Sequence, residues 1–260
     1  MPEPAERLAI AQVTPYAWES GHEVNRAIAR VAERLTARGH RVAILAPSTS
    51  PDAVRRTARL LRDASGDGAA LLGASGGADE AGGAPVLAIG EQLGPFTTGR
   101  GRALPVDVTR AIERAFERVG FDLCHVHDPW APSVASAALR SSPALNVGTF
   151  HAPTERVVAS QLARRLVQLV FGRLDARIAS FEATAELMRR LVGGEYRTVL
   201  PAADPVRRTQ RPAGAPLRIA AVDVEERGAL RLFLRALRRL PEELAWEAVV
   251  FSRTGAIPTL

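Results

Sequence analysis

Two short stretches hold most of the side chains that could do chemistry. One reads His125-Val126-His127-Asp128, and the other reads Gly148-Thr149-Phe150-His151; each ends a short apolar run. In an open parallel α/β sheet, ligands bind in the crevice outside the carboxyl ends of the strands. We therefore expect His127, Asp128 and His151 to lie at the ends of two strands. Side-chain alternation along a strand would turn His125 to the same side as His127.

These residues also fit two other interpretations. Imidazole and carboxylate groups are zinc ligands, so His125, His127, Asp128 and His151 could share a metal if His151 reached the others. The spacing does not require that arrangement, and we expect no metal. The alternative is structural: His127 and Asp128 would end a strand, and His151 would cap a helix that begins near residue 155.

The rest of the chain alternates between strand and helix patterns. The expected strands are 8–13, 41–46, 85–89, 123–127, 145–149, 176–180 and 197–200. The expected helices are one after Gly21, then 51–63, 106–119, 132–140, 155–174 and 183–192. This alternation predicts an α/β fold, a Rossmann-like, doubly wound parallel sheet over residues 1–200. The Gly- and Ala-rich segment 64–84 is expected to be a loop.

The first helix has clear periodicity and a candidate start signal. Its apolar face is predicted from a 3.6-residue period and holds Val24, Ile28, Val31 and Leu35. Ser20 and Glu23 have the S-x-x-E spacing of a capping box. We also expect His22 and Glu23 to serve the helix start rather than a ligand.

A proline-rich linker, 201–216, precedes a second and shorter pattern. Residues 217–260 show one strand, one helix with a leucine stripe, and a second strand. This pattern predicts an incomplete second Rossmann-like βαβ piece. Because one such unit cannot cover both faces of its own sheet, we expect it to dock on the first domain, to pair with another chain, or to be a truncated remnant.

Composition limits the function classes. The 260-residue chain has a net charge of +6, and all of its basic residues are Arg. Without an aromatic and basic binding platform, that charge is weak evidence for nucleic acid, which we do not expect as a partner. The exposed-looking arginines at 55, 56, 59 and 62 are expected to form a solvated helix face. Cys124 is expected to be a buried small apolar residue. With neither a signal peptide nor a membrane span in the sequence, we expect a cytoplasmic protein.

Five motifs in order resemble a known family. They are Val13-Thr14-Pro15-Tyr16, Arg38-Gly39-His40-Arg41-Val42, the His125–Pro129 stretch after Phe121-Asp122-Leu123, Thr149-Phe150-His151, and Val199-Leu200-Pro201. Together they resemble the N-terminal domain of family 4 glycosyltransferases with the GT-B fold, and in particular the bacterial phosphatidylinositol mannosyltransferases. The resemblance covers residues 7–205 well and residues 217–251 more weakly.

The resemblance implies an enzyme that transfers a hexose from a nucleotide sugar to a lipid or small-molecule acceptor, with retention and without a metal or other cofactor. His151 would be the catalytic residue beside the donor sugar. Tyr16, His127 and Asp128 would line the acceptor side, and Gly21 and Arg227 would bind the donor. In this family a basic surface meets anionic lipid, so peripheral contact with the inner membrane surface is a further expectation for the arginine-rich helix.

Departures from the family pattern keep a second function open. His22-Glu23 replaces a glycine pair beside the donor diphosphate, and Ala220-Ala221 replaces Gly-Arg in the second domain. The family's paired glutamates have no counterpart after the linker. The alternative is a non-catalytic module that binds an acceptor or a partner, with its donor half lost or supplied by a second chain.

Overall fold

The computed structural model describes residues 7–63, 79–81, 83–91, 105–130, 133–151, 169–202, 214–223 and 227–252. Contacts within the chain divide it into two compact units, Met1–Ala203 and Asp204–Leu260. Each unit is described by itself.

The first unit is built on one sheet. Its strands are β1 (Ala9–Val13), β2 (Arg41–Ser48), β3 (Asp79–Ala81), β4 (Ala84–Glu91), β5 (Leu123–His127), β6 (Leu145–Phe150), β7 (Ala176–Ala179) and β8 (Arg197–Thr198). They lie in the order β3-β4-β2-β1-β5-β6-β7-β8, and every pair is parallel except β3 with β4. The strand order reverses between β1 and β5, which confirms the predicted doubly wound, Rossmann-like sheet.

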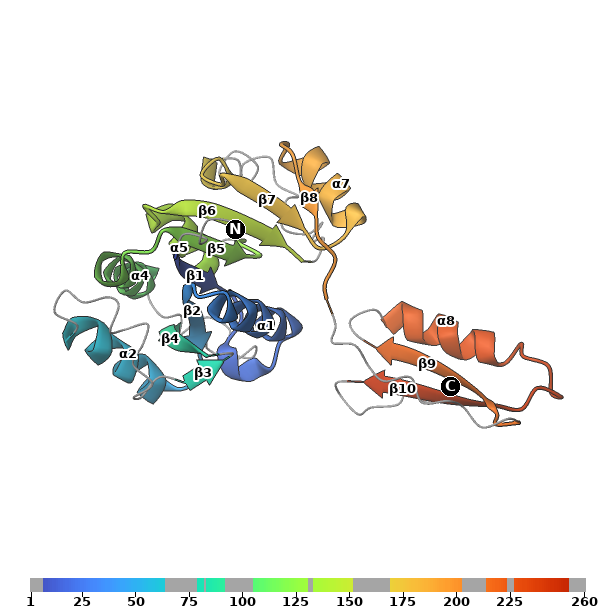
Figure 1. Ribbon diagram of the computed structural model, residues 1–260. Coiled ribbons are helices and arrows are strands. Elements are labelled where there is room, and N and C mark those ends of the chain that lie inside the picture. Colours follow the sequence, from blue (N-terminus) through green and yellow to red (C-terminus); the bar gives the residue numbers. More distant parts are fainter. Residues whose placement is uncertain are drawn as a thin grey trace, which may run out of the picture. The chain divides into compact units, whose positions relative to one another are not determined.

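Helices cover both faces of this sheet (Figure 1). They are η1 (Trp18–Ser20), α1 (Glu23–Ala37), α2 (Pro51–Asp63), α4 (Pro105–Val119), α5 (Val134–Ser141) and α7 (Glu182–Leu191). Helix α1 lies on one face, and α2, α4 and α5 lie on the other (Figure 1). The sequence of β1 explains this, because Ile10 packs in the cluster that holds α1, and Ala11 and Val13 pack in the opposite one.

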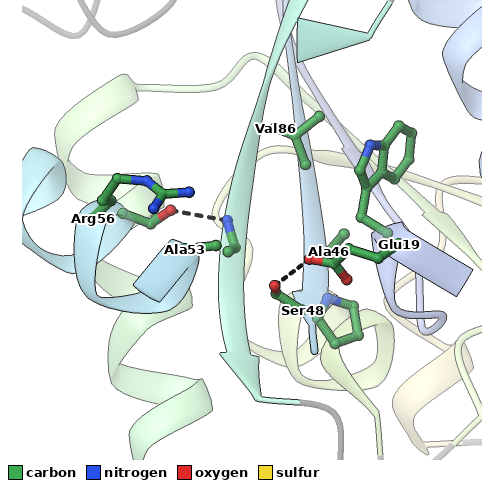
Figure 2. A pocket seen from close by; sticks show the side chains of 10 residues that line it. Glu19, Ala46, Ser48, Ala53, Arg56 and Val86 are labelled. Atoms are coloured by element: carbon green, nitrogen blue, oxygen red, sulfur yellow. Dashed lines mark hydrogen bonds between the residues drawn. The ribbon is translucent and has the colours of Figure 1, made fainter. Parts of the chain in front are cut away.

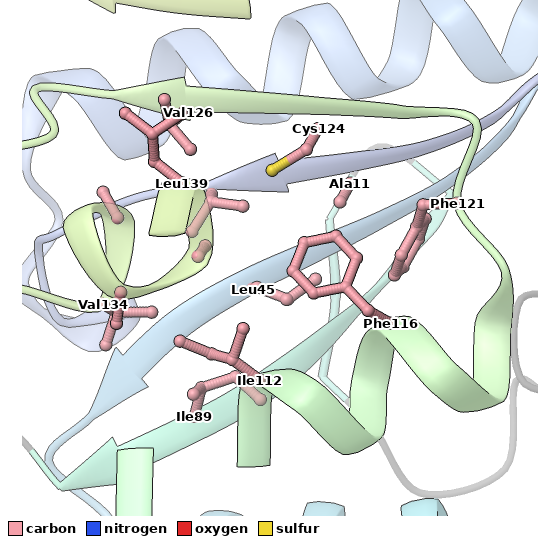
Figure 3. Close-up of a cluster of buried hydrophobic side chains, with 14 of the residues drawn as sticks. Ala11, Leu45, Ile89, Ile112, Phe116, Phe121, Cys124, Val126, Val134 and Leu139 are labelled. Carbon is pink, nitrogen blue, oxygen red and sulfur yellow. The ribbon is translucent and has the colours of Figure 1, made fainter. Parts of the chain in front are cut away.

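The larger of the two clusters contains the aromatic and aliphatic side chains of α4 and α5 (Figure 3). Ile112 and Phe116 of α4 and Leu139 of α5 are each at most 4% exposed and pack over the central strands. Cys124 of β5 is fully buried in the same cluster, and burial raises the pKa of its thiol to about 12. As predicted, Cys124 is a structural residue rather than a reactive thiol.

Three local expectations need correction. The helix start is capped by His22, whose Nδ1 accepts from the backbone N–H of Val24, so Ser20 and Glu23 do not form a capping box. Ser20 instead donates to the Ala17 carbonyl, 2.6 Å away, at η1.

The other two corrections concern the buried face of α1 and the predicted loop. Val31 is 39% exposed, and the buried stripe continues at Ala32. Residues 64–78 of the predicted loop 64–84 lie outside the described residues, but residues 79–81 form strand β3, which pairs antiparallel with β4.

Most of the expected helix 155–174 lies outside the described residues, as does most of the linker 201–216. On α2 the arginine-rich face is exposed as predicted, with Ala53, Thr57 and Leu61 forming the buried side. In the described parts of the chain, no helix is long and apolar enough to cross a bilayer.

The second unit has the predicted strand, helix and strand. They are β9 (Leu217–Asp223), α8 (Arg227–Leu237) and β10 (Trp246–Ser252), and the two strands pair in parallel. Leu230 and Leu237 are the buried positions of the helical stripe, at 7% and 9% exposure.

Gly148 in β6 offers a direct test of packing beneath the site. A Cβ at this position would lie 2.8 Å from Leu174 Cδ1, and Leu174 is only 6% exposed. We expect Gly148→Ala to lower the free energy of unfolding by about 1–3 kcal/mol, the usual cost of overpacking a core. Urea unfolding followed by tryptophan fluorescence measures this change.

The matched control is the same substitution in a Leu174→Ala background. Removing the clashing methyl groups should make Gly148→Ala nearly neutral there, because the two residues are in contact and their effects are not additive. An equal loss in both backgrounds would show that the close approach is not the cause.

Candidate functional site

Three of the predicted site residues meet at the carboxyl edge of the sheet, beyond the paired ends of β1 and β5. The carboxylate of Asp128 accepts two hydrogen bonds: Oδ1 from the backbone N–H of His151 at 2.8 Å, and Oδ2 from the Tyr16 hydroxyl at 3.2 Å. Asp128 therefore joins the loop after β1 to the end of β6. Because this edge is the crevice of a doubly wound sheet, the arrangement lies where such folds bind ligands.

Asp128 has an unusual backbone conformation for this role. Its φ is +42°, and it is the only non-glycine residue with positive φ in the described chain. Its N–H donates to the Thr149 carbonyl at 2.8 Å, so the β5–β6 ladder continues through the strained residue. Aspartate tolerates the left-handed region better than most residues, and such strain is concentrated at functional sites.

A second set of contacts runs across the ends of four adjacent strands, β1, β5, β6 and β7. Gln12 of β1 is 2.9 Å from Nε2 of His127 on β5, and His127 Nδ1 is 2.9 Å from Nε2 of His151 after β6. His151 Nδ1 is 2.9 Å from the hydroxyl of Ser180 after β7. We call these four residues the histidine relay. It engages both ring nitrogens of His127 and of His151 with protein groups.

His125 points to the same side of β5 as His127, as alternation predicted, with ring centroids 4.2 Å apart. Its Nε2 lies 2.7 Å from the hydroxyl of Thr149, so its ring is held by the neighbouring strand. Within the described residues, no group of three or more His, Cys, Asp or Glu side chains is placed to hold a metal ion.

Burial sets the charge of the site. It lowers the pKa of His151 and of His125 to about 4, and repulsion from neighbouring histidines adds to the effect. The pKa of His127, fully enclosed, lies well below the ordinary value for the same reasons. Burial raises the pKa of Asp128 to about 6, although the His151 and Tyr16 hydrogen bonds oppose that rise. At neutral pH the imidazoles are therefore uncharged and Asp128 carries the negative charge.

The loop that carries Tyr16 is held by a buried amide of α1. Asn25 is 3% exposed; its Oδ1 accepts from Thr14 Oγ1 at 2.7 Å and its Nδ2 donates to the Ala17 carbonyl at 2.8 Å. The Tyr16 ring also stacks on His22, with centroids 3.6 Å apart. Tyr16 thus has a fixed position beside the amino end of α1.

The two predicted donor-binding residues have different outcomes. Gly21 has φ +61° and ends η1 in the left-handed conformation that glycine adopts without strain, directly before His22. Arg227 begins α8 in the second unit, and its side chain lies outside the described part of the chain. Gly21 therefore lies in the same β1–α1 connection as Tyr16. No contact of Arg227 is described.

The family model for Glycosyltransferase Family 4 matches residues 24–207 of this chain. The chain belongs to glycosyltransferase family 4. The matched segment contains β5, β6 and β7, and with them His127, Asp128 and His151.

Curated relatives of this family 4 protein agree with that assignment. A phosphatidyl-myo-inositol mannosyltransferase of Mycobacterium leprae is 24% identical over 196 residues, which cover 70% of this chain and 41% of the relative. One of Propionibacterium freudenreichii is 29% identical over 106 residues, 36% of this chain and 28% of the relative. The chain spans well under half the length of these curated relatives.

Solved structures show the fold. Sucrose-phosphate synthase from Thermosynechococcus elongatus has a TM-score of 0.61 at 13% identity, covering 95% of this chain and 62% of that one. A glycosyltransferase from Rickettsia africae has a TM-score of 0.59 at 13% identity, and the match covers 94% of this chain and 60% of the Rickettsia chain. The Rossmann-like architecture is that of the GT-B glycosyltransferases.

A small pocket lies on the β2–β4 side of the sheet, between η1, the end of β2 and α2 (Figure 2). Glu19 on its wall accepts hydrogen bonds from the Ser48 hydroxyl and, at 3.0 Å, from the Thr49 backbone N–H. Burial alone would raise the pKa of Glu19, but these hydrogen bonds outweigh it and lower the pKa. Tyr16, Asp128 and His151 do not line this pocket.

Sequence reasoning missed Gln12, Asn25 and Ser180. One signal for Gln12 was available, since it is the only polar residue in the apolar strand Ala9–Val13; the structure shows it 1% exposed. A polar side chain in a fully buried strand needs a partner. Ser180 offered a weaker signal, because it follows β7 as His151 follows β6.

Proposed function

We propose that this protein transfers a hexosyl group from a nucleotide sugar to a lipid or small-molecule acceptor, with retention of configuration and without a metal. The observation that carries the proposal is the Tyr16–Asp128–His151 network at the sheet's carboxyl edge in a member of glycosyltransferase family 4. The name of its curated relatives favours a mannosyl donor and a phosphatidylinositol acceptor.

The chemistry of the network suits a ligand rich in hydroxyl groups. Asp128 supplies a carboxylate that accepts hydrogen bonds, Tyr16 supplies a hydroxyl, and His151 supplies an uncharged, half-buried ring. Catalysis would come from positioning the acceptor against the donor and from stabilising the leaving diphosphate. Gly21, two residues before α1, and Arg227 of the second unit are the residues we assign to the diphosphate.

Calorimetry of the full chain with nucleoside diphosphate hexoses, mannose included, tests the proposal. We expect saturable binding of one of them. His151→Ala should weaken it about tenfold or more, equivalent to roughly 1.4 kcal/mol of lost contact and positioning. Arg227→Ala should also weaken binding, through the diphosphate.

His40→Ala is the matched control, because His40 precedes β2 at the amino edge of the sheet, where its ring accepts from the Leu8 N–H. Its affinity should equal that of the unaltered protein. If a folded sample binds none of the nucleotide sugars, the donor site is not functional. That result would favour the non-catalytic module, which Glu23 in the first turn of α1 and Ala220-Ala221 in β9 also support.

A further inference from the structure

The hydrogen bonds of the histidine relay all run in one donor-to-acceptor direction. Gln12, at the buried end of the relay, sets that direction. Gln12 directs its Oε1, which can only accept, at Nε2 of His127. His127 must therefore carry its proton on Nε2. Because the ring is uncharged at neutral pH, its Nδ1 is left as an acceptor.

The same reasoning passes to the next ring. His127 Nδ1 accepts, so Nε2 of His151 must donate across the 2.9 Å contact. His151 Nδ1 is then an acceptor, and the Ser180 hydroxyl donates to it. In this one direction both ring nitrogens of His127 and both of His151 have a complementary partner. Gln12 and His127, at 1% and 3% exposure, are shielded from solvent.

We propose that Gln12 is a positioning residue that fixes, through His127, which ring nitrogen of His151 carries the proton. It does so from β1, two strands away from β6 in the sheet. Ser180 completes the relay but does not set its direction, because it can either donate or accept. The functional part of the inference rests on the proposed role of His151 beside the donor sugar.

The proposal makes an asymmetric prediction for the two ends. In Gln12→Met, a proton on His127 Nε2 would be a buried N–H without an acceptor, which is rarer and less tolerated than an unfilled acceptor. The protons should move to Nδ1 of both rings, and the Ser180 hydroxyl should then accept from His151. In Ser180→Ala, His151 Nδ1 loses only a donor, so the Nε2–H form should persist.

Nitrogen NMR of the full chain with ¹⁵N-labelled histidine measures the tautomers directly at neutral pH. The rings are assigned from single His→Gln variants. We expect Nε2–H for His127 and His151 in the unaltered protein, Nδ1–H for both in Gln12→Met, and Nε2–H restored in Gln12→Glu, which keeps an acceptor oxygen. Ser142→Ala, which removes another buried hydroxyl at the amino edge of the sheet, should change neither ring.

Two results would overturn the proposal. One is an unchanged His151 tautomer in Gln12→Met with a native near-ultraviolet circular dichroism spectrum. The other is movement of the His151 proton in Ser180→Ala, which would show that Ser180 rather than Gln12 determines the tautomer. If Gln12→Met does not fold, loss of Nε2–H in Gln12→Glu or in Ser180→Ala still overturns the proposal, which requires both variants to retain it.

An activity measurement connects the relay with transfer. Where the protein transfers hexose, Gln12→Met should lower kcat about tenfold or more, as loss of an orienting partner does for other functional histidines, with little change in KM. Gln12→Glu should recover most of that loss. The absence of any transfer would count against the proposed function alone, because the tautomers are read without substrate.

Discussion

Acidification from about pH 6.5 to about pH 4 is expected to destabilise the first unit by several kcal/mol. The folded pKa values of His125 and His151 are about 4, below the ordinary 6.5, because the surrounding protein desolvates both rings. In this pH range the unfolded chain binds more protons than the folded one, so the free energy of unfolding falls as pH falls. At about 1.4 kcal/mol per pKa unit, each of the two rings contributes about 3 kcal/mol.

His127 acts in the same direction, since its pKa is also lowered. Asp128 acts in the opposite direction: its folded pKa of about 6 exceeds the ordinary 3.8, so its contribution is full below pH 4 and is lost as pH rises through 6. The three histidines together outweigh the one carboxyl group, so the net effect of acidification is a loss of folding stability.

Urea unfolding at several pH values between 4 and 7.5, followed by tryptophan fluorescence, measures how steeply the free energy of unfolding changes with pH. His151→Gln should flatten it, because one of the rings that resists protonation is gone. Asp128→Asn should steepen it, because the opposing group is gone. A stability that does not change between pH 6.5 and pH 4 would show that these rings are not buried uncharged.

Asp128→Ala is expected to cost about 3 kcal/mol of unfolding free energy, more than either Asp128→Asn or Asp128→Gly. Alanine removes the acceptors of the Tyr16 hydroxyl and the His151 N–H, each worth roughly 1 kcal/mol. It must also adopt φ +42°, at a cost of about 1–2 kcal/mol for a residue with an unsupported Cβ.

The two other variants separate these contributions. Asparagine keeps an acceptor oxygen and tolerates positive φ, so it should cost less than about 1 kcal/mol at pH 7. Glycine relieves the strain but loses both hydrogen bonds, so it should cost about 2 kcal/mol.

Urea midpoints for the three variants give the order Asn, Gly, Ala from least to most destabilised. Asp52→Ala is the control: it removes a carboxylate from α2 that pairs with Arg55 at 2.6 Å in solvent, and it should leave the midpoint nearly unchanged. If alanine and asparagine proved equally stable at position 128, neither the two hydrogen bonds nor the backbone strain would matter.

Most of the architecture of this family 4 protein could be predicted from its residues. Alternation of apolar runs with helical stripes indicated the parallel sheet, because buried parallel strands and amphipathic helices leave different periods in a sequence. The same logic located His127, Asp128 and His151 at strand ends. It also found His22 at the start of α1, although with the wrong capping partner, since several polar residues near a helix start can fill that role.

Local patterns could not show which side chains meet. Gln12 and His127 are 115 residues apart in sequence, and His151 and Ser180 are 29 apart; only the β1-β5-β6-β7 strand order brings them into one relay. The positive φ of Asp128 and its two hydrogen bonds likewise depend on the register of β5 with β6.

The sequence by itself thus determined the fold class and the edge of the sheet that carries the polar residues. The tertiary structure decided which of those residues are buried, which are hydrogen-bonded to one another, and which are charged. The physical reason is that periodicity depends on neighbours a few positions apart, whereas burial and proton placement depend on strands that pair across a hundred residues.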